Sequence, residues 1–170
     1  RRLANGGDHH FERGLMRAWL LDLLACPHCP DEHPLSLRID WAMEDEIVDG
    51  RLSCPSCGRS WPVRDGIPRF VSSDQDYCDN FGFQWQHWKT VQIDRLAGHT
   101  LSETRFLADS GWSPDWIKDK LILDCGCGAG RFTDIAAKHG ARVVSVDLSQ
   151  AVNACRETTM VWDGRVQPIQ

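Results

Sequence analysis

The pattern of apolar and polar positions divides the chain into two parts. In the first part, residues 15–24 form an apolar run interrupted by Arg17 and Asp22, which predicts a short amphipathic helix. Residues 35–39 and 47–52 alternate apolar and polar side chains and predict strands, with a turn at residues 49–50. Residues 61–70 predict two short extended pieces around a turn at residues 65–66. The first part is therefore expected to be a small, mostly β domain.

The second part has a strand–loop–helix–strand pattern. Residues 102–107 predict a helix that ends before Gly111 and Pro114. Two short apolar runs at 121–124 and 142–147 predict buried strands, and a glycine loop and a helix over 132–139 lie between them. Ser149 can cap a helix through residue 157, and residues 164–170 suggest a third strand. The fold class is α/β, with domains at 15–71 and 72–170.

Continuous apolar strands imply more structure than this chain supplies. Such strands are buried on both faces and expect helices on each side and further strands alongside. We therefore expect 72–170 to be the first, incomplete part of a larger sheet domain, and the chain to be a fragment that is inactive alone.

Composition excludes several classes of protein. The 170 residues are 42% hydrophobic and 25% charged, which is typical of a soluble globular protein and excludes general disorder. No run approaches the roughly 20 apolar residues that a membrane span needs. The net charge is −5, without a basic half, so tight electrostatic binding of nucleic acid is not expected.

Four of the eight cysteines form two Cys-x-x-Cys pairs, Cys26 with Cys29 and Cys54 with Cys57. Such pairs bend so that their thiolates face one point, and two pairs complete a tetrahedral zinc site. Because four protein ligands leave no open position for water, the zinc is expected to be structural. A redox pair is the alternative, but redox motifs come singly. Paired thiols beside unpaired ones indicate a reducing compartment, and hence the cytoplasm.

A glycine loop follows the strand at 121–124. Asp124 ends the strand, and glycines stand at 126, 128 and 130. The dinucleotide fingerprint would need a third glycine where Arg131 stands, and no Gly-Lys-Ser/Thr of a phosphate loop follows. Asp147 ends the next strand and can accept both hydroxyls of a ribose. An acid beside the loop suits an amino group, so a nucleoside joined to an amino acid fits best: S-adenosylmethionine.

These residues resemble two known families. Leu-Asp124-Cys-Gly-Cys-Gly-Ala-Gly-Arg131 with Val-Asp147-Leu-Ser resembles the first two motifs of class I S-adenosylmethionine-dependent methyltransferases. The segments Leu23-Leu-Ala-Cys-Pro and Trp61-Pro-Val-Arg-Asp-Gly-Ile-Pro are similar to a zinc-ribbon family that activates some methyltransferases. Their fusion through Phe81-Gly-Phe-Gln-Trp85 resembles bacterial methyltransferases of small molecules or glycans.

The resemblance implies roles for individual residues. The methionine end of the cofactor would be lined by Asp124, Gly126, Gly128 and Gly130. Asp147 would hold the ribose, and Leu148 would pack on the adenine. Catalytic residues stay unassigned. The remaining candidates are interpreted as packed, surface or hydrogen-bonded side chains: Cys125, Cys127, His87, His99, Phe81, Phe83, Trp85 and Trp88. For the phenylalanines and tryptophans among them, a lid over the cofactor is the alternative.

The preferred function is therefore methyl transfer from S-adenosylmethionine to an unidentified acceptor, a small molecule or glycan. Methylation of RNA is an alternative that the acidic balance disfavours. A different class of function is a non-catalytic module whose zinc ribbon binds a protein partner.

Overall fold

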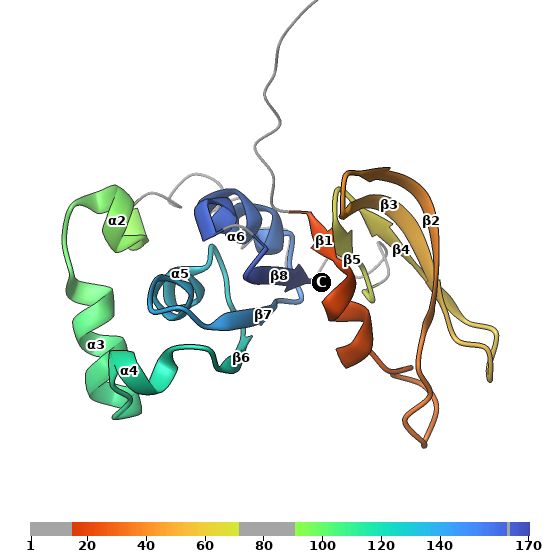
Figure 1. Cartoon of the computed structure of the whole chain (residues 1–170), viewed down its shortest axis with the longest axis horizontal. Helices are drawn as coiled ribbons and strands as arrows, with labels where there is room; N and C mark the ends of the chain where they lie inside the picture. The colour runs from red at the N-terminus through yellow and green to blue at the C-terminus, as the bar shows by residue number, and fades with distance from the viewer. Residues whose placement is uncertain (1–14, 72–90, 163) are drawn as a thin grey trace, which may run out of the picture.

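The computed structural model describes residues 15–71, 91–162 and 164–170 (Figure 1). The predicted boundary near residue 72, Cys78, His87 and the aromatic residues at 81–88 lie outside these ranges. Figure 1 shows the first part of the chain at one end, helices α2–α4 at the other, and three strands with two helices between them.

The first part is an antiparallel sheet with one short helical segment. Its elements are β1 (Met16–Arg17), the 3-10 helix η1 (Ala18–Leu23), β2 (Ser36–Met43), β3 (Glu46–Ser53), β4 (Ser60–Arg64) and β5 (Ile67–Pro68). The strand order is β1-β3-β4-β5, and β2 also pairs with β3. The strands at 35–39, 47–52 and 61–70 are thus confirmed. The amphipathic α-helix over 15–24 is wrong in form, because its first residues pair with β3 and the rest form η1.

The predicted turn at residues 49–50 is also wrong. Gly50 lies inside β3, where it pairs with Ile39 on one side and Val63 on the other. A Cβ at Gly50 would lie 2.6 Å from the carbonyl oxygen of Arg38, so this glycine allows two strands to approach closely. The chain instead reverses between β2 and β3, where Glu44 has a φ of 52°.

The second part has the predicted α/β pattern. Its elements are α2 (Asp94–Ala97), α3 (Leu101–Ser110), α4 (Pro114–Ile117), β6 (Leu121–Cys125), α5 (Arg131–Lys138), β7 (Arg142–Val146), α6 (Ala151–Thr159), the 3-10 helix η3 (Met160–Trp162) and β8 (Val166–Ile169). The three strands are parallel in the order β6-β7-β8. Gly111 ends α3 in a left-handed conformation, and Ser113 caps α4.

The two faces of this parallel sheet have different covers. On one face, Val143 and Val166 pack with Ala136 and Ala137 of α5. On the other face, Val144 and Ile169 belong to a single buried cluster with residues of the first part. That cluster includes Met16, Leu20, Leu35, Ile47, Leu52, Trp61 and Val63. The antiparallel domain therefore covers a sheet face that a helix would cover in a doubly wound fold.

A buried glutamine ties the two parts together. The side chain of Gln167 in β8 is 1% exposed. Its Oε1 accepts a hydrogen bond from the Arg17 N–H at 2.8 Å, and its Nε2 donates to the Leu15 carbonyl at 3.2 Å. Trp19 adds a bond from Nε1 to the Gly164 carbonyl. Because these polar groups satisfy one another across the junction, the two parts are expected to fold together.

Strand β6 forms one edge of the parallel sheet. Leu121 and Leu123 are 46% and 61% exposed, on the same face as Val144 but beyond the antiparallel domain. The apolar pattern of β6 predicts that further helices or strands pack on this face. Within the described residues no element covers Leu121 and Leu123, so both side chains are exposed. No helix within the described ranges is long and apolar enough to cross a membrane.

Candidate functional site

The four predicted zinc ligands converge on one point. The Sγ atoms of Cys26, Cys29, Cys54 and Cys57 lie within 4.8 Å of one another. Cys26 and Cys57 are 3.7 Å apart, and so are Cys29 and Cys54. Sulfurs placed roughly 2.3 Å from a zinc ion at the corners of a tetrahedron would be separated by about 3.8 Å. The donor set and its spacing therefore fit a structural zinc ion.

Backbone turns hold the cysteine pairs in this geometry. In the second pair, the Gly58 N–H donates to the Cys54 carbonyl at 2.9 Å, and Gly58 has a φ of 71° with open space around its missing side chain. In the first pair, the Cys26 N–H donates to the His33 carbonyl. His28, which lies between two ligands, stacks on Trp61 with ring centroids 5.9 Å apart. It is a neighbour of the cluster and not a fifth ligand.

The thiols of the first pair differ in acidity. Burial opposes ionisation of Cys26, but backbone N–H groups of His28 and Cys29 outweigh it and lower its pKa to about 7. For Cys29, burial and the facing thiols act together and raise the pKa to about 12. The Cys29 thiol thus resists ionisation unless a cation lies among the sulfurs, as is typical of a metal centre.

The predicted cofactor residues gather at the carboxyl ends of β6 and β7. The loop after β6 turns back on β7, because the N–H groups of Gly126 and Cys127 both donate to the Val146 carbonyl. Gly126 has a φ of 79°, and a Cβ there would meet no atom within 4 Å. This glycine therefore presents bare backbone to open space, where a ligand can approach it closely.

Gly130 serves a different purpose in the same loop. It has a φ of 88°, and a Cβ there would lie 3.0 Å from the Cys155 sulfur and 3.2 Å from Thr159. The loop is thus pressed against α6 on its inner side. Cys127 is buried in this region, as the packing interpretation predicts, whereas Cys125 is exposed.

Asp147 is held in place by its neighbours. Its Oδ2 accepts a hydrogen bond from the Gly128 N–H at 2.9 Å. Its Oδ1 accepts bonds from both the N–H and the hydroxyl of Ser149, at 2.9 and 2.7 Å. A carboxylate has about four acceptor positions, so one position on Oδ2 stays open and the Ser149 hydroxyl occupies another that it can vacate by rotating. Leu148, next to Asp147, is 70% exposed.

Asp124 lies on the helix-covered side of the loop. Its Oδ2 accepts a 2.6 Å hydrogen bond from the Thr133 hydroxyl, which lies 2.9 Å from the buried Ser145 hydroxyl. Burial raises the pKa of Asp124 against the effect of Thr133, and the negative charge of Asp147 adds to the increase. The loop therefore places two carboxylates close enough to influence each other, a pattern that favours a cationic or amino ligand group.

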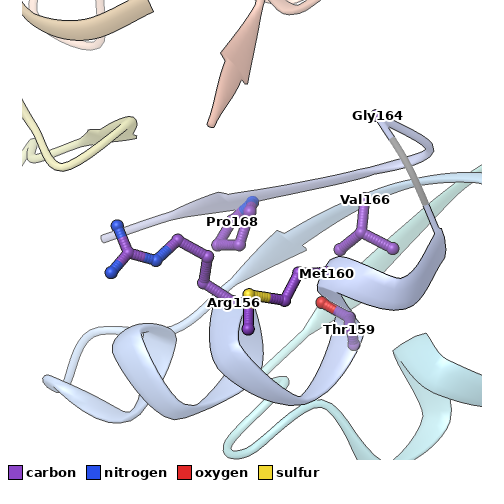
Figure 2. Close-up of a pocket in the computed structure, with 6 residues that line it drawn as sticks. All are labelled: Arg156, Thr159, Met160, Gly164, Val166 and Pro168. Atoms are coloured by element: carbon purple, nitrogen blue, oxygen red, sulfur yellow. The ribbon is translucent and has the colours of Figure 1, made fainter. Parts of the chain in front are cut away.

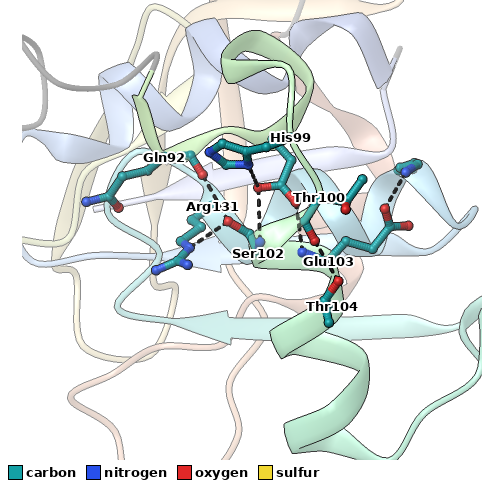
Figure 3. Close-up of polar contacts among 9 residues, drawn as sticks. Gln92, His99, Thr100, Ser102, Glu103, Thr104 and Arg131 are labelled. Atoms are coloured by element: carbon teal, nitrogen blue, oxygen red, sulfur yellow. Dashed lines mark hydrogen bonds and ion pairs between the residues drawn. The ribbon is translucent and has the colours of Figure 1, made fainter.

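A polar network secures the segment before the loop (Figure 3). Buried Asp94 accepts bonds from the N–H groups of Ser102 and Glu103 and pairs with His99 Nδ1 at 2.9 Å. Arg131, the first residue of α5, donates to the Ser102 hydroxyl at 2.8 Å. His99 thus lies against a buried carboxylate, and the network anchors α3 to the helix that follows the glycine loop.

The hollow in Figure 2 lies between α6 and β8 and contains none of the predicted site residues. It is lined by Arg156, Thr159, Met160, Gly164, Val166 and Pro168. These side chains are mainly those that pack the helix on the strand.

Three supporting residues escaped the sequence reasoning. Thr133 and Ser145 orient Asp124, and Ser149, expected only to cap α6, also binds Asp147. One signal for this existed in the sequence, because Ser145 is a polar residue inside the apolar run of β7.

Comparisons with known proteins match the two parts of the chain to different families. Residues 18–66 match the family described as "Trm112p-like protein", and residues 123–166 match the family described as "Methyltransferase domain". Protein arginine N-methyltransferase 1 of Saccharomyces cerevisiae is 48% identical over 90 residues, which cover 52% of this chain and 24% of the yeast protein. Ubiquinone biosynthesis O-methyltransferase of Pasteurella multocida is 33% identical over 78 residues, covering 46% of this chain and 32% of that protein.

Among solved structures, phosphoethanolamine N-methyltransferase 1 of Haemonchus contortus shares 20% identity, with a TM-score of 0.35. The match covers 53% of this chain and 20% of the other. The chain thus spans about a quarter to a third of the length of the curated relatives it matches.

Proposed function

We propose that this chain, in which a Trm112p-like zinc ribbon precedes a class I methyltransferase domain, is part of an enzyme that transfers a methyl group from S-adenosylmethionine. The observation that carries the proposal is the pairing of the glycine loop with Asp147. The Gly128 N–H binds the Asp147 carboxylate at 2.9 Å, at the carboxyl ends of two adjacent parallel strands. This edge is where open α/β sheets bind their ligands.

The residues of the loop suit the separate parts of this cofactor. Asp147 can accept one ribose hydroxyl at its open Oδ2 position and a second when the Ser149 hydroxyl rotates away. The bare backbone at Gly126 allows close approach, and Asp124 provides a partner for the amino group. Leu148 supplies an exposed apolar surface for the adenine. When bound, S-adenosylmethionine supplies a methyl group that its sulfonium already activates, and positioning by the protein then contributes most to the rate.

The zinc ribbon is proposed to serve this chain's own methyltransferase domain. Its buried residues pack on Val144 and Ile169 of the parallel sheet, and Gln167 bonds to its backbone. The main apolar cluster of the ribbon is therefore buried against the parallel sheet of the same chain. The alternative of a ribbon that binds a separate protein partner would have to use another surface.

For the acceptor, we favour a small molecule, including a glycan. The net charge of −5 argues against a polyanion such as RNA. The ubiquinone biosynthesis relative carries the name of an O-methyltransferase of a small-molecule pathway, whereas the yeast relative is named for protein arginine. The unbridged cysteines of the described residues fit a reducing compartment, so we place the protein in the cytoplasm.

The decisive experiment measures binding of S-adenosylhomocysteine by calorimetry to the purified protein and to Asp147→Ala. We expect the variant to bind about tenfold more weakly, because the ribose hydroxyls lose a charged acceptor. Asp115→Ala, which removes an exposed carboxylate from α4, should bind normally. Equal affinity in Asp147→Ala and the unaltered protein would refute the ribose assignment, and no binding by either would remove the proposed function.

A further inference from the structure

An arginine of the zinc ribbon reaches across to the methyltransferase domain. Arg69 follows β5, and its Nη1 donates to Gln170 Oε1 at 2.7 Å and to Gln150 Oε1 at 3.4 Å. Its Nη2 donates to Asn153 Oδ1 at 2.7 Å. One guanidinium group thus joins the end of β8 to the first turn of α6.

The main chain holds Arg69 firmly on the ribbon side. Its N–H donates to the Pro62 carbonyl of β4 at 2.9 Å. On either side of it, the ribbon pairs with the end of β8: the Gln170 N–H donates to the Pro68 carbonyl, and the Phe70 N–H donates to the Gln170 carbonyl. Arg69 is therefore held by a backbone bond to β4, and its two chain neighbours are bonded to Gln170, which is also one of its side-chain partners.

The acceptors of Arg69 frame the turn that carries Asp147. Gln150 follows this turn and occupies the N-cap position of α6. On the other side, the Asp147 N–H donates to the carbonyl of Ile169, the residue before Gln170. One end of the turn therefore leads into Gln150, a partner of Arg69, and the other end is bonded to Ile169, the neighbour of its partner Gln170.

The electrostatic setting is unusual for an arginine. All three acceptors are neutral amides, so the bonds bring no opposite charge to the guanidinium. Burial and the positive charges of Arg156 and Arg64 lower the pKa of Arg69 to about 10, against the opposing effect of the Asp65 carboxylate, so the group keeps its charge at neutral pH. The guanidinium is thus a half-buried charge whose three hydrogen-bond acceptors all belong to the second part of the chain.

We propose that Arg69 is a positioning residue for the cofactor. It holds the 147–150 turn in the geometry that binds ribose, so that the folded zinc ribbon sets the affinity of the neighbouring methyltransferase site. This inference rests on the proposed function, because it assigns the turn to cofactor binding.

The test is a double-mutant cycle of Arg69→Ala and Asp147→Ala, with binding of S-adenosylhomocysteine measured by calorimetry. In the unaltered background, Arg69→Ala should weaken binding about tenfold, the scale of one lost charged hydrogen-bonding partner. In the Asp147→Ala background the same change should have little effect, because the group that Arg69 positions is gone. Arg51→Ala, which removes another ribbon arginine that bonds only within the ribbon at Ser60, should leave affinity unchanged.

The outcomes separate the two proposals. An unchanged affinity in Arg69→Ala, or an equal loss in both backgrounds, would overturn the positioning role while leaving the proposed function intact. An unchanged affinity in Asp147→Ala would instead refute the ribose assignment on which this inference rests, and no binding of S-adenosylhomocysteine by the unaltered protein would reject the proposed function. Zinc content and circular dichroism establish that each variant is folded. If Arg69→Ala does not fold, Asn153→Ala removes one acceptor from the opposite side and should weaken binding about threefold, with the same dependence on Asp147.

Discussion

Removing zinc from the ribbon should unfold the parallel sheet as well. The perturbation is a strong chelator, or Cys54→Ser, which removes one of the four ligands. Without the metal, the short strands of residues 15–71 have too small a core to stay folded. The face of the parallel sheet that the ribbon covers would then be exposed to water.

The free energies involved indicate that the parallel sheet unfolds with the ribbon. Structural zinc contributes on the order of 10–16 kcal/mol to the folding of small zinc domains, whereas a whole domain is stable by about 5–15 kcal/mol. On the sheet itself, Val144 and Ile169 are 9% and 7% exposed and pack against the ribbon. Exposing both would lose roughly 3–6 kcal/mol, at about 1.5–3 kcal/mol for each side chain. The three-stranded sheet is not expected to survive both losses.

Hydrogen exchange resolves the two parts of the molecule separately. The amides of β7, Val143–Val146, lie in the centre of the parallel sheet and should lose protection at the same chelator concentration as those of β3. Cys125→Ser is the matched control, because Cys125 is an exposed cysteine outside the metal cluster and should keep both zinc and protection. Retained protection in β7 after the ribbon has released its zinc would show that the two parts fold independently.

Two further changes test individual contacts. Gln167→Met should lower the free energy of unfolding by about 2–4 kcal/mol, because the Arg17 N–H and the Leu15 carbonyl lose their side-chain partner in the interior. Urea denaturation measures this change. The control is Gln92→Met, at a half-buried glutamine in the segment before α2. Glu103→Gln should destabilise the protein at neutral pH, since the Lys138 ammonium lowers the pKa of Glu103 in the folded state. Because its folded-state pKa is depressed, the Glu103 carboxylate stabilises the protein at pH values above its unfolded-state pKa of about 4.3. This stabilisation is lost as the pH falls through the folded-state pKa, so the free energies of unfolding of the variant and the parent should converge in acid. A difference that stays constant down to pH 2 would contradict the ion-pair explanation.

Local spacing was enough to predict the chemistry-bearing residues. Two Cys-x-x-Cys pairs predict a metal cluster because each pair is a short turn whose geometry depends on few neighbours, and the structure brings Cys26 and Cys54 together as expected. In the same way, Asp124 and Asp147 each end an apolar run. The carboxyl ends of adjacent parallel strands meet at one edge, so their proximity follows from the strand assignment.

Predictions that depended on contacts between distant segments failed. Asp49-Gly50 is a sequence typical of a turn, but Gly50 lies in a strand because Ile39 and Val63 pair with it on either side. Residues 15–24 have a helical pattern, but Met16 pairs with β3 and converts the start of the segment into a strand. In both cases tertiary pairing outweighed local propensity, which is worth only about 1 kcal/mol per residue.

The sequence by itself determined the four-cysteine cluster, the glycine loop and the β-α-β order of the second part, because each follows from short-range spacing and periodicity. Only the tertiary structure decided that the ribbon and the parallel sheet share one core, and that Arg69 joins them beside the Asp147 turn. The partners of Arg69 lie 81 to 101 residues away along the chain. No periodicity of one segment encodes which face of another it will cover, since that choice depends on the fit of complete surfaces.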